Sequence, residues 1–244
     1  MTTRVHLLSS MVLGGALVVG STLVPGTASA TSMVTETFEG FSSDDPINAI
    51  VFADGTQASV VTDSNRSANR GGLDQAFAFD TNNFTGNDSD LVSDFPFAPD
   101  PSITRDLGIV AVIGGPGALV AGSSAPTPND DLFGGTITFN FDRIVDLLSF
   151  DFVDTEPNGN ELFATGFNNG SQVGSSGALV AGDGQFGTFT AGLFGIDSVE
   201  FAFGGSGALD NLTIAAVPVP AALPMLLGGL GLFGVMGWRR KSTA

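Results

Sequence analysis

The chain of 244 residues contains no cysteine and no tyrosine, and its one histidine is His6. Without cysteine there is no disulfide framework, no thiolate nucleophile and no cysteine-based metal centre. His6 lies in a segment that we expect to be removed, so the mature protein should also lack Ser-His-Asp triads and histidine-ligated metals. Many of the usual catalytic and metal-binding side chains are therefore excluded.

Basic residues are scarce as well, with 8 Lys+Arg against 25 Asp+Glu. All the acidic residues lie between Glu36 and Asp210. Within that stretch the cations are four arginines, Arg66, Arg70, Arg105 and Arg143. A negative field of this kind repels phosphate backbones, which excludes nucleic acid as a partner and leaves metal cations as the plausible ionic partners. An alternative reading is that the acidic surface only keeps an exported protein soluble in salty water.

What the chain does contain is glycine (34 residues) and phenylalanine (21 residues), within a hydrophobic fraction of 43%. Such a chain is too apolar to be disordered and too rich in glycine for a helical bundle. Short apolar segments separated by Gly, Asn, Asp and Pro are typical of an all-β protein, and we predict a jelly-roll-like β-sandwich. The phenylalanines should close its core, each contributing roughly 1.5–3 kcal/mol when fully buried.

Alternation of apolar and polar residues predicts individual strands. The expected strands are 135–141, 148–152, 199–203, a last one through Leu212 and Ile214, and the continuous apolar run 109–113. The run 109–113 has no polar face, so we expect it to be buried on both faces.

The first 30 residues resemble a secretory signal peptide. Arg4 precedes an apolar run, and small residues at Ala28 and Ala30 form the cleavage site that signal peptidase accepts. We expect cleavage after Ala30, which leaves residues 31–216 as the ectodomain.

Residues 217–244 have three parts in a fixed order. A proline-bearing motif comes first and consists of Val217, Pro218, Val219, Pro220 and Ala221. The apolar stretch 221–238 follows, and as a helix it would span about 27 Å, enough for a single transmembrane helix. The last part, 239–244, begins with three cations, Arg239, Arg240 and Lys241. These cations should stay in the cytoplasm, so the ectodomain faces outward.

This tripartite tail resembles the PEP-CTERM family of bacterial protein-sorting signals, in its VPLPA-CTERM variant. The resemblance implies processing near Pro220 and Ala221 by a membrane transpeptidase-like enzyme, an exosortase. It also implies an exported protein, first anchored in the inner membrane and then placed at the cell surface or outside the cell, where a polysaccharide matrix is present.

A polar cluster between residues 80 and 90 has the oxygen ligands and the glycine that a calcium site needs. The sequence demands no cofactor, and calcium is the candidate that suits these ligands. The predicted ligands are five aspartates, Asp80, Asp88, Asp90, Asp130 and Asp131. Glu39 near the first strand, with Asp210 and Asn211 at the last, is predicted as a separate site of the jelly-roll kind. Asp and Asn are also common turn residues, and that reading stays open.

The sequence favours a protein that is not an enzyme and has a structural or adhesive role linked to extracellular polysaccharide. One alternative is a calcium-dependent carbohydrate-binding module. Another is a glycoside hydrolase that uses a carboxylate pair. The glutamates available for such a pair are Glu36, Glu39, Glu156, Glu161 and Glu200.

Overall fold

The alternating segments of the sequence form long, curved strands in the computed structural model, which describes residues 32–65, 74–83, 90–114 and 133–217. All of these residues belong to one compact unit that spans Ala30–Val219. The signal peptide, the expected transmembrane helix and the basic tail lie outside the described residues. Within the described ranges, no helix is long and apolar enough to cross a membrane.

The described residues contain twelve strands and no helix, so the all-β prediction is confirmed. The strands are β1 (Met33–Glu36), β2 (Ala49–Val51), β3 (Gln57–Ser64), β4 (Ala76–Asp80), β5 (Phe95–Phe97), β6 (Asp100–Arg105), β7 (Ile109–Ile113), β8 (Gly135–Val153), β9 (Leu162–Asn168), β10 (Ser171–Ser175), β11 (Phe186–Phe203) and β12 (Ala208–Ala216).

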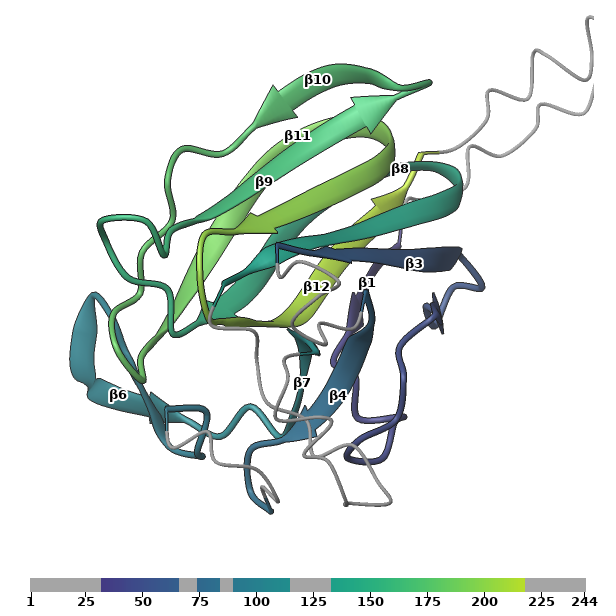
Figure 1. Cartoon of the computed structure of the whole chain (residues 1–244). Coiled ribbons are helices and arrows are strands. Elements are labelled where there is room, and N and C mark those ends of the chain that lie inside the picture. Colours follow the sequence, from purple (N-terminus) through teal and green to yellow (C-terminus); the bar gives the residue numbers. More distant parts are fainter. Residues whose placement is uncertain (1–31, 66–73, 84–89, 115–132, 218–244) are drawn as a thin grey trace, which may run out of the picture. The chain divides into compact units, whose positions relative to one another are not determined.

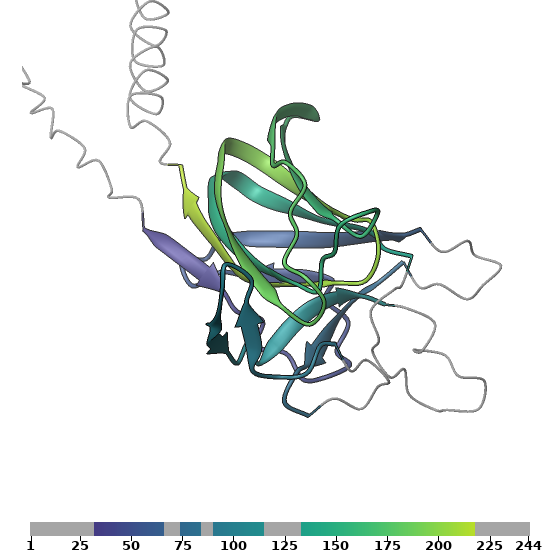
Figure 2. The same cartoon turned by 90° about the vertical axis from the view of Figure 1, so that its left-hand side faces the viewer.

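Hydrogen bonds join these strands into one large mixed sheet rather than two separately bonded sheets. Its main path runs β10-β9-β11-β8-β12-β7-β4, and β1, β2, β3, β5 and β6 attach to its sides. Figures 1 and 2 show β8, β9, β10 and β11 curving over one part of the domain, while β4 and β7 lie in another. The register of β11 against β8 shifts three times between Thr190 and Ser198, and such irregularities bend long strands.

The expected strands 135–141 and 148–152 are the two ends of the single 19-residue strand β8. The residues between them do not alternate cleanly, because Asp142 and Arg143 are both exposed. The other strand predictions agree with the structure. Val199, Phe201 and Phe203 are buried in β11, and all five residues of β7 are buried.

Phenylalanine forms much of the core, as predicted from its abundance. Phe201 lies edge-on to both Phe139 and Phe150, with ring centroids 5.8 and 4.8 Å apart. Phe150 also contacts Phe189 across the β8–β11 ladder. Edge-to-face pairs contribute about 0.5–1.5 kcal/mol beyond the area that they bury. This ring cluster packs β8 against β11 and so positions Asp151, which lies next to Phe150 near the end of β8.

Candidate functional site

A polar pocket of about 470 Å³ is lined by segments from the beginning, the middle and the end of the described domain. Its walls come from the turn after β1, the segment between β6 and β7, and the start of β12. The lining residues are Thr37, Glu39, Asn82, Arg105, Asp106, Leu107, Gly108, Asp210 and Asn211. The structure therefore brings together Glu39, Asp210 and Asn211, which the sequence grouped as a separate site.

Two buried carboxylates occupy neighbouring strands beside this pocket. Asp151 of β8 and Asp210 of β12 are register partners in the antiparallel ladder, and each is 2% exposed. Like charges directly opposite each other destabilise a sheet unless other groups compensate them. The surroundings of these two residues must therefore supply that compensation.

Asp151 is fully compensated. Its Oδ2 accepts hydrogen bonds from Nη1 of Arg105 at 2.5 Å and from Nδ2 of Asn211 at 2.8 Å, and its Oδ1 accepts one from Oγ1 of Thr188. The Arg105 guanidinium also lies over the Phe186 ring, 4.9 Å from its centroid. Arg105 is thus fixed by both an ion pair and an aromatic face.

Asp210 is compensated only in part. Its Oδ2 accepts a hydrogen bond from Nδ2 of Asn211 at 2.9 Å, and its Oδ1 has no hydrogen-bond partner among the described residues. Burial, with the nearby carboxylates of Asp151 and Glu39, raises the pKa of Asp210 to about 8. Asn211 itself has a positive φ of 52°, at the point where the β12–β8 register shifts.

Glu39 closes the pocket from the turn after β1. Its Oε1 accepts the backbone N–H of Ile109 at 2.9 Å, which draws the carboxylate over the backbone of Gly108. A Cβ at Gly108 would lie 2.0 Å from that oxygen, and the φ of Gly108 is +63°. Only glycine allows both the backbone conformation and the close approach of the carboxylate at this position.

Hydrogen bonds hold the rim of the pocket in place. Oδ1 of Asp106 accepts hydrogen bonds from the backbone N–H of Gly108 and from Nδ2 of Asn82. The carbonyl of Gly108 accepts both the N–H and the Oγ1 hydroxyl of Thr81. Many groups of the pocket therefore have their hydrogen bonds satisfied within the fold, whereas Oδ1 of Asp210 is a fully buried atom of the described lining that has no hydrogen-bond partner.

The structure describes two of the five aspartates of the predicted calcium site, Asp80 and Asp90. Asp88, Asp130 and Asp131 lie outside the described residues, and their role as ligands stays a prediction. Oδ1 of Asp80 accepts the backbone N–H groups of Asn82 and Asn83, which is the turn role weighed as the alternative.

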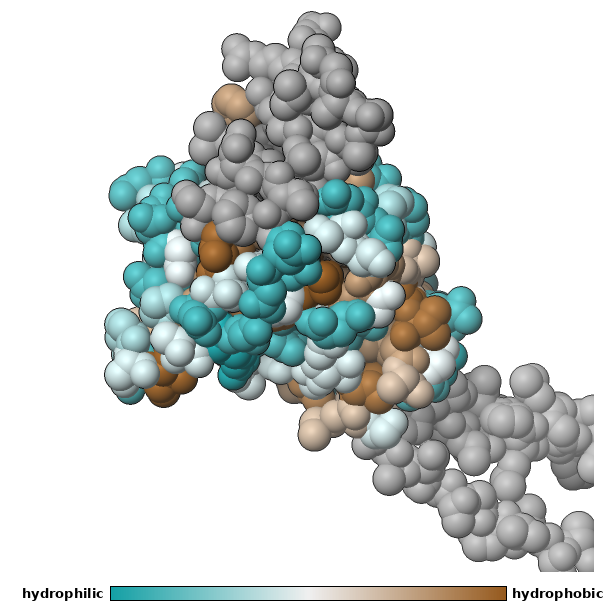
Figure 3. Space-filling view, turned by 90° about the horizontal axis from the view of Figure 1, so that it is seen from below, coloured by the Kyte–Doolittle hydropathy of each residue, from teal (hydrophilic) through white to brown (hydrophobic). Residues whose placement is uncertain are grey.

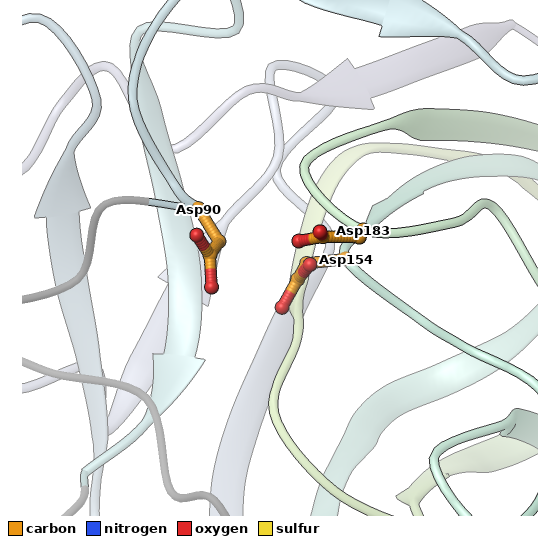
Figure 4. Close-up of side chains that lie close together, drawn as sticks. All are labelled: Asp90, Asp154 and Asp183. Carbon is orange, nitrogen blue, oxygen red and sulfur yellow. The ribbon is translucent and has the colours of Figure 1, made fainter.

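Asp90 lies in an acidic cluster with Asp154 and Asp183, in which one carboxylate oxygen from each lies within 4.8 Å of the others (Figure 4). Asp154 is buried, and its oxygens accept the backbone N–H of Gly184 and the hydroxyl of Ser206. Asp90 and Asp183 are exposed. Asp154 thus ties the loop before β11 to the rest of the fold, while its two neighbours face solvent.

The glutamates considered for hydrolysis are dispersed among several elements. Glu36 and Glu39 flank the end of β1, and Glu200 lies in β11 opposite Thr138 and Thr165. The carboxylate of Glu161 accepts the backbone N–H groups of Asn158 and Gly159 and so holds a turn. These hydrogen bonds give Glu161 a structural role, and a hydrolytic carboxylate pair remains only a sequence-based expectation.

Sequence reasoning missed Arg105, Asp106 and Gly108, which complete the pocket, and Asp183, which joins the acidic cluster. For Asp106, Gly108 and Asp183 the available signal was their position in short segments that contain Asp and Gly, 106–108 and 182–184, while Arg105 is the last residue of β6. That signal does not indicate which distant strand a turn will meet.

Comparison with known proteins gives one family match. Residues 216–241 match the model of the PEP-CTERM protein-sorting motif, and the predicted residues 217–221 and 239–241 fall within the match. No curated protein is significantly similar to the chain. One similar solved structure is GH31 CBM32-2 bound to GalNAc, at 16% identity and a TM-score of 0.24, over 39% of this chain and 72% of that one. The family match confirms the resemblance of the tail: this chain carries a PEP-CTERM protein-sorting motif at residues 216–241.

Proposed function

We propose that this protein is an exported cell-surface or extracellular-matrix protein, processed by an exosortase, in which an acidic all-β domain has a structural or adhesive role. The observation that carries the proposal is the sorting motif at residues 216–241. This motif implies a membrane-associated precursor and processing by an exosortase.

The last described strand ends where the sorting motif begins. Ala216 is the last residue of β12, and the N–H of Val217 still bonds to the carbonyl of Ile144 at 3.0 Å. β12 is an interior strand that pairs with β1, β7 and β8. A cut near Pro220 and Ala221 would therefore release the whole domain and remove none of its strands.

The other predicted processing step, removal of the signal peptide, cuts the chain just before β1, which pairs with β12. β1 begins at Met33, three positions after Ala30, and Met33 is the register partner of Ala215 in β12. The antiparallel pairing of β1 with β12 thus holds the two ends of the mature domain together. This arrangement supports a precursor that can fold before either end has been cut.

The surface supports a role outside the cell. Hydrophilic residues cover most of the described surface in Figure 3, and hydrophobic residues appear there as separate patches. Both arginines among the described residues are paired with aspartates, Arg105 with Asp151 and Arg143 with Asp142. The remaining surface charge is almost entirely acidic, which favours solubility and bridging by cations over contact with anionic polymers.

The test is intact-mass measurement of the full chain, expressed in a Gram-negative host with and without an exosortase. We expect loss of the first 30 residues in both hosts and loss of the tail only when the exosortase is present. A Pro220→Ala variant should keep its tail, while Pro218→Ala provides a matched comparison within the motif. A wild-type chain that keeps residues 221–244 beside an active exosortase would refute the proposed processing.

Calcium-dependent carbohydrate binding is the second candidate function, and the pocket is the observation that favours it. Amide, carboxylate and guanidinium groups line this pocket, and such groups hydrogen-bond sugar hydroxyls. A glycan array probed with and without calcium tests this role. Binding that appears only with calcium would support it, and no binding in either condition would leave the structural role.

A further inference from the structure

The pocket lined by the turn after β1, the segment before β7 and the start of β12 includes a residue with a fully buried oxygen that has no hydrogen-bond partner. What this pocket binds does not depend on the proposed export or processing. Oδ1 of Asp210 belongs to a residue that is 98% buried, since its exposed fraction is 2%, and no described donor reaches this oxygen. An unpaired buried carboxylate oxygen is costly, so a ligand that supplies positive charge would be strongly favoured there.

The charges of the pocket are unevenly paired. Arg105 is the one cation that lines the pocket among the described residues, and it is already paired with Asp151. Asp210 and Glu39 lie on the same pocket with no cationic partner, and the charge of Glu39 acts on Asp210. Two carboxylates that share a pocket, in which the one lining cation is bonded to Asp151, form a site that favours a divalent cation.

Glu39 is held in place by the backbone before and at the start of β7. The Ile109 N–H occupies Oε1, and the missing Cβ of Gly108 lets the carboxylate lie flat against the backbone. Glu39 is a lining residue of the pocket, and this hydrogen bond uses only one of its two carboxylate oxygens. Asn211 adds an amide whose Nδ2 is directed to Asp151 and Asp210, so its carbonyl oxygen is available as a neutral ligand.

We propose that this pocket binds a calcium ion through Oδ1 of Asp210 and the carboxylate of Glu39, with Asn211 and water completing the coordination. The ligands are all oxygens, which suits a hard cation, and the pocket is wide enough to hold waters in the remaining positions. Magnesium demands a tighter octahedral arrangement at shorter distances, so calcium is the better fit for two carboxylates on separate strands.

The experiment is calcium titration of the full chain in detergent micelles by isothermal titration calorimetry, after chelation and dialysis. We expect a Kd on the order of 10⁻⁴ to 10⁻³ M, the range of extracellular modules. Asp210→Asn and Glu39→Gln keep the shape of each side chain and should each weaken binding by tenfold or more. Magnesium should bind at least tenfold more weakly than calcium.

The acidic cluster of Asp90, Asp154 and Asp183 provides the matched control. Asp183→Asn removes one exposed carboxylate from that cluster and leaves the pocket intact, so calcium binding at the pocket should keep its Kd. If Asp183→Asn abolished binding while Asp210→Asn left it unchanged, the cation would belong to the acidic cluster and the proposal would be overturned. A wild-type chain that binds no calcium, with Asp210 simply protonated in its pocket, would overturn it as well.

Folding of the variants is checked separately by circular dichroism and thermal melting in chelator. Asp210→Asn removes a buried carboxylate, so this variant should melt no lower than wild type without calcium, yet lose the shift that calcium gives. This combination distinguishes loss of a ligand from loss of the fold. A variant that melts lower in chelator and keeps the calcium shift would contradict the proposed site.

Discussion

Asp151 and Asp210 face each other as register partners on β8 and β12, and both are 2% exposed, yet only Asp151 has a cationic partner. Asn211 bridges them by donating to both carboxylates, at 2.8 and 2.9 Å. The pair is therefore asymmetric. One carboxylate is tied into the fold by an ion pair and a hydroxyl, and the other, which belongs to a pocket residue, has a buried oxygen without a hydrogen-bond partner.

Loss of charge at Asp151 should destabilise the domain. Asp151→Asn would weaken the hydrogen bonds from Arg105, Thr188 and Asn211 and leave the guanidinium without its partner. Because half of the Arg105 side chain is exposed, water would replace part of the interaction. We expect a loss of about 1–3 kcal/mol in the free energy of unfolding, measured by urea denaturation. An unchanged midpoint would show that the ion pair contributes nothing to stability.

Stability without calcium should depend on pH through Asp210. The folded-state pKa of about 8 exceeds the ordinary value of 3.8, mainly because of burial. The charges of Asp151 and Glu39 also raise the pKa, while a hydrogen bond from the backbone N–H of Asn211 and the charge of Arg105 lower it. Between these two values the folded state holds a proton that the unfolded state has released. The contribution of Asp210 to stability therefore falls as the pH rises from about 4 to 8 and is constant above that range.

Asp210→Asn should remove this dependence. In chelator, the stability difference between variant and wild type should grow in favour of the variant from pH 5 to pH 8 and then level off. Urea midpoints at four or five pH values measure it, with Asp183→Asn as the comparison for general charge effects. Parallel pH curves for wild type and Asp210→Asn would mean that Asp210 titrates normally in the folded state.

Gly108 should be intolerant of a side chain. In Gly108→Ala the new Cβ would meet the Glu39 carboxylate at 2.0 Å, on a backbone with a φ of +63°, so the carboxylate must leave the Ile109 N–H. We expect a loss of about 1–3 kcal/mol from strain and the lost hydrogen bond. Gly55→Ala is the control, since its φ is +84° but nothing lies within 4 Å of the added Cβ. Equal losses in thermal melting would exclude a special role for the Glu39 contact.

The ring cluster should dominate the stability of the core. Phe201→Ala removes a fully buried ring that contacts Phe139 and Phe150, and we expect a loss of about 3–5 kcal/mol. Phe194 is 63% exposed, so Phe194→Ala should change the urea midpoint little. Similar effects in the two variants would show that the assigned core is wrong.

The strands were predictable because their signal is local. Alternation identified Ile137, Phe139 and Phe141 as one buried face, and Val199, Phe201 and Phe203 as another. The union of two predicted strands into β8 was not predictable, because it depends on how β3, β11 and β12 pair with different parts of it.

The pocket was predictable in part. The grouping of Glu39 with Asp210 and Asn211 needed only the expectation that the first and last strands are neighbours, and β1 indeed pairs with β12. The same alternation assigned Asp151 to the polar face of its strand, but it is buried. Its burial depends on Arg105 and Asn211, which lie 46 and 60 positions away in the chain. A local sequence pattern cannot predict hydrogen-bond partners that are so distant in the chain.

The pairing of β1 with β12 has a mechanical consequence. β12 ends at Ala216, next to the sorting motif, whereas Asp210 lies near the other end of the same strand, about 20 Å away at the rise of an extended strand. A pull between a surface attached at the tail and a ligand held at the pocket would run along β12. The ladder to β1 and β8 would then be loaded in shear, with its hydrogen bonds resisting together instead of opening one at a time.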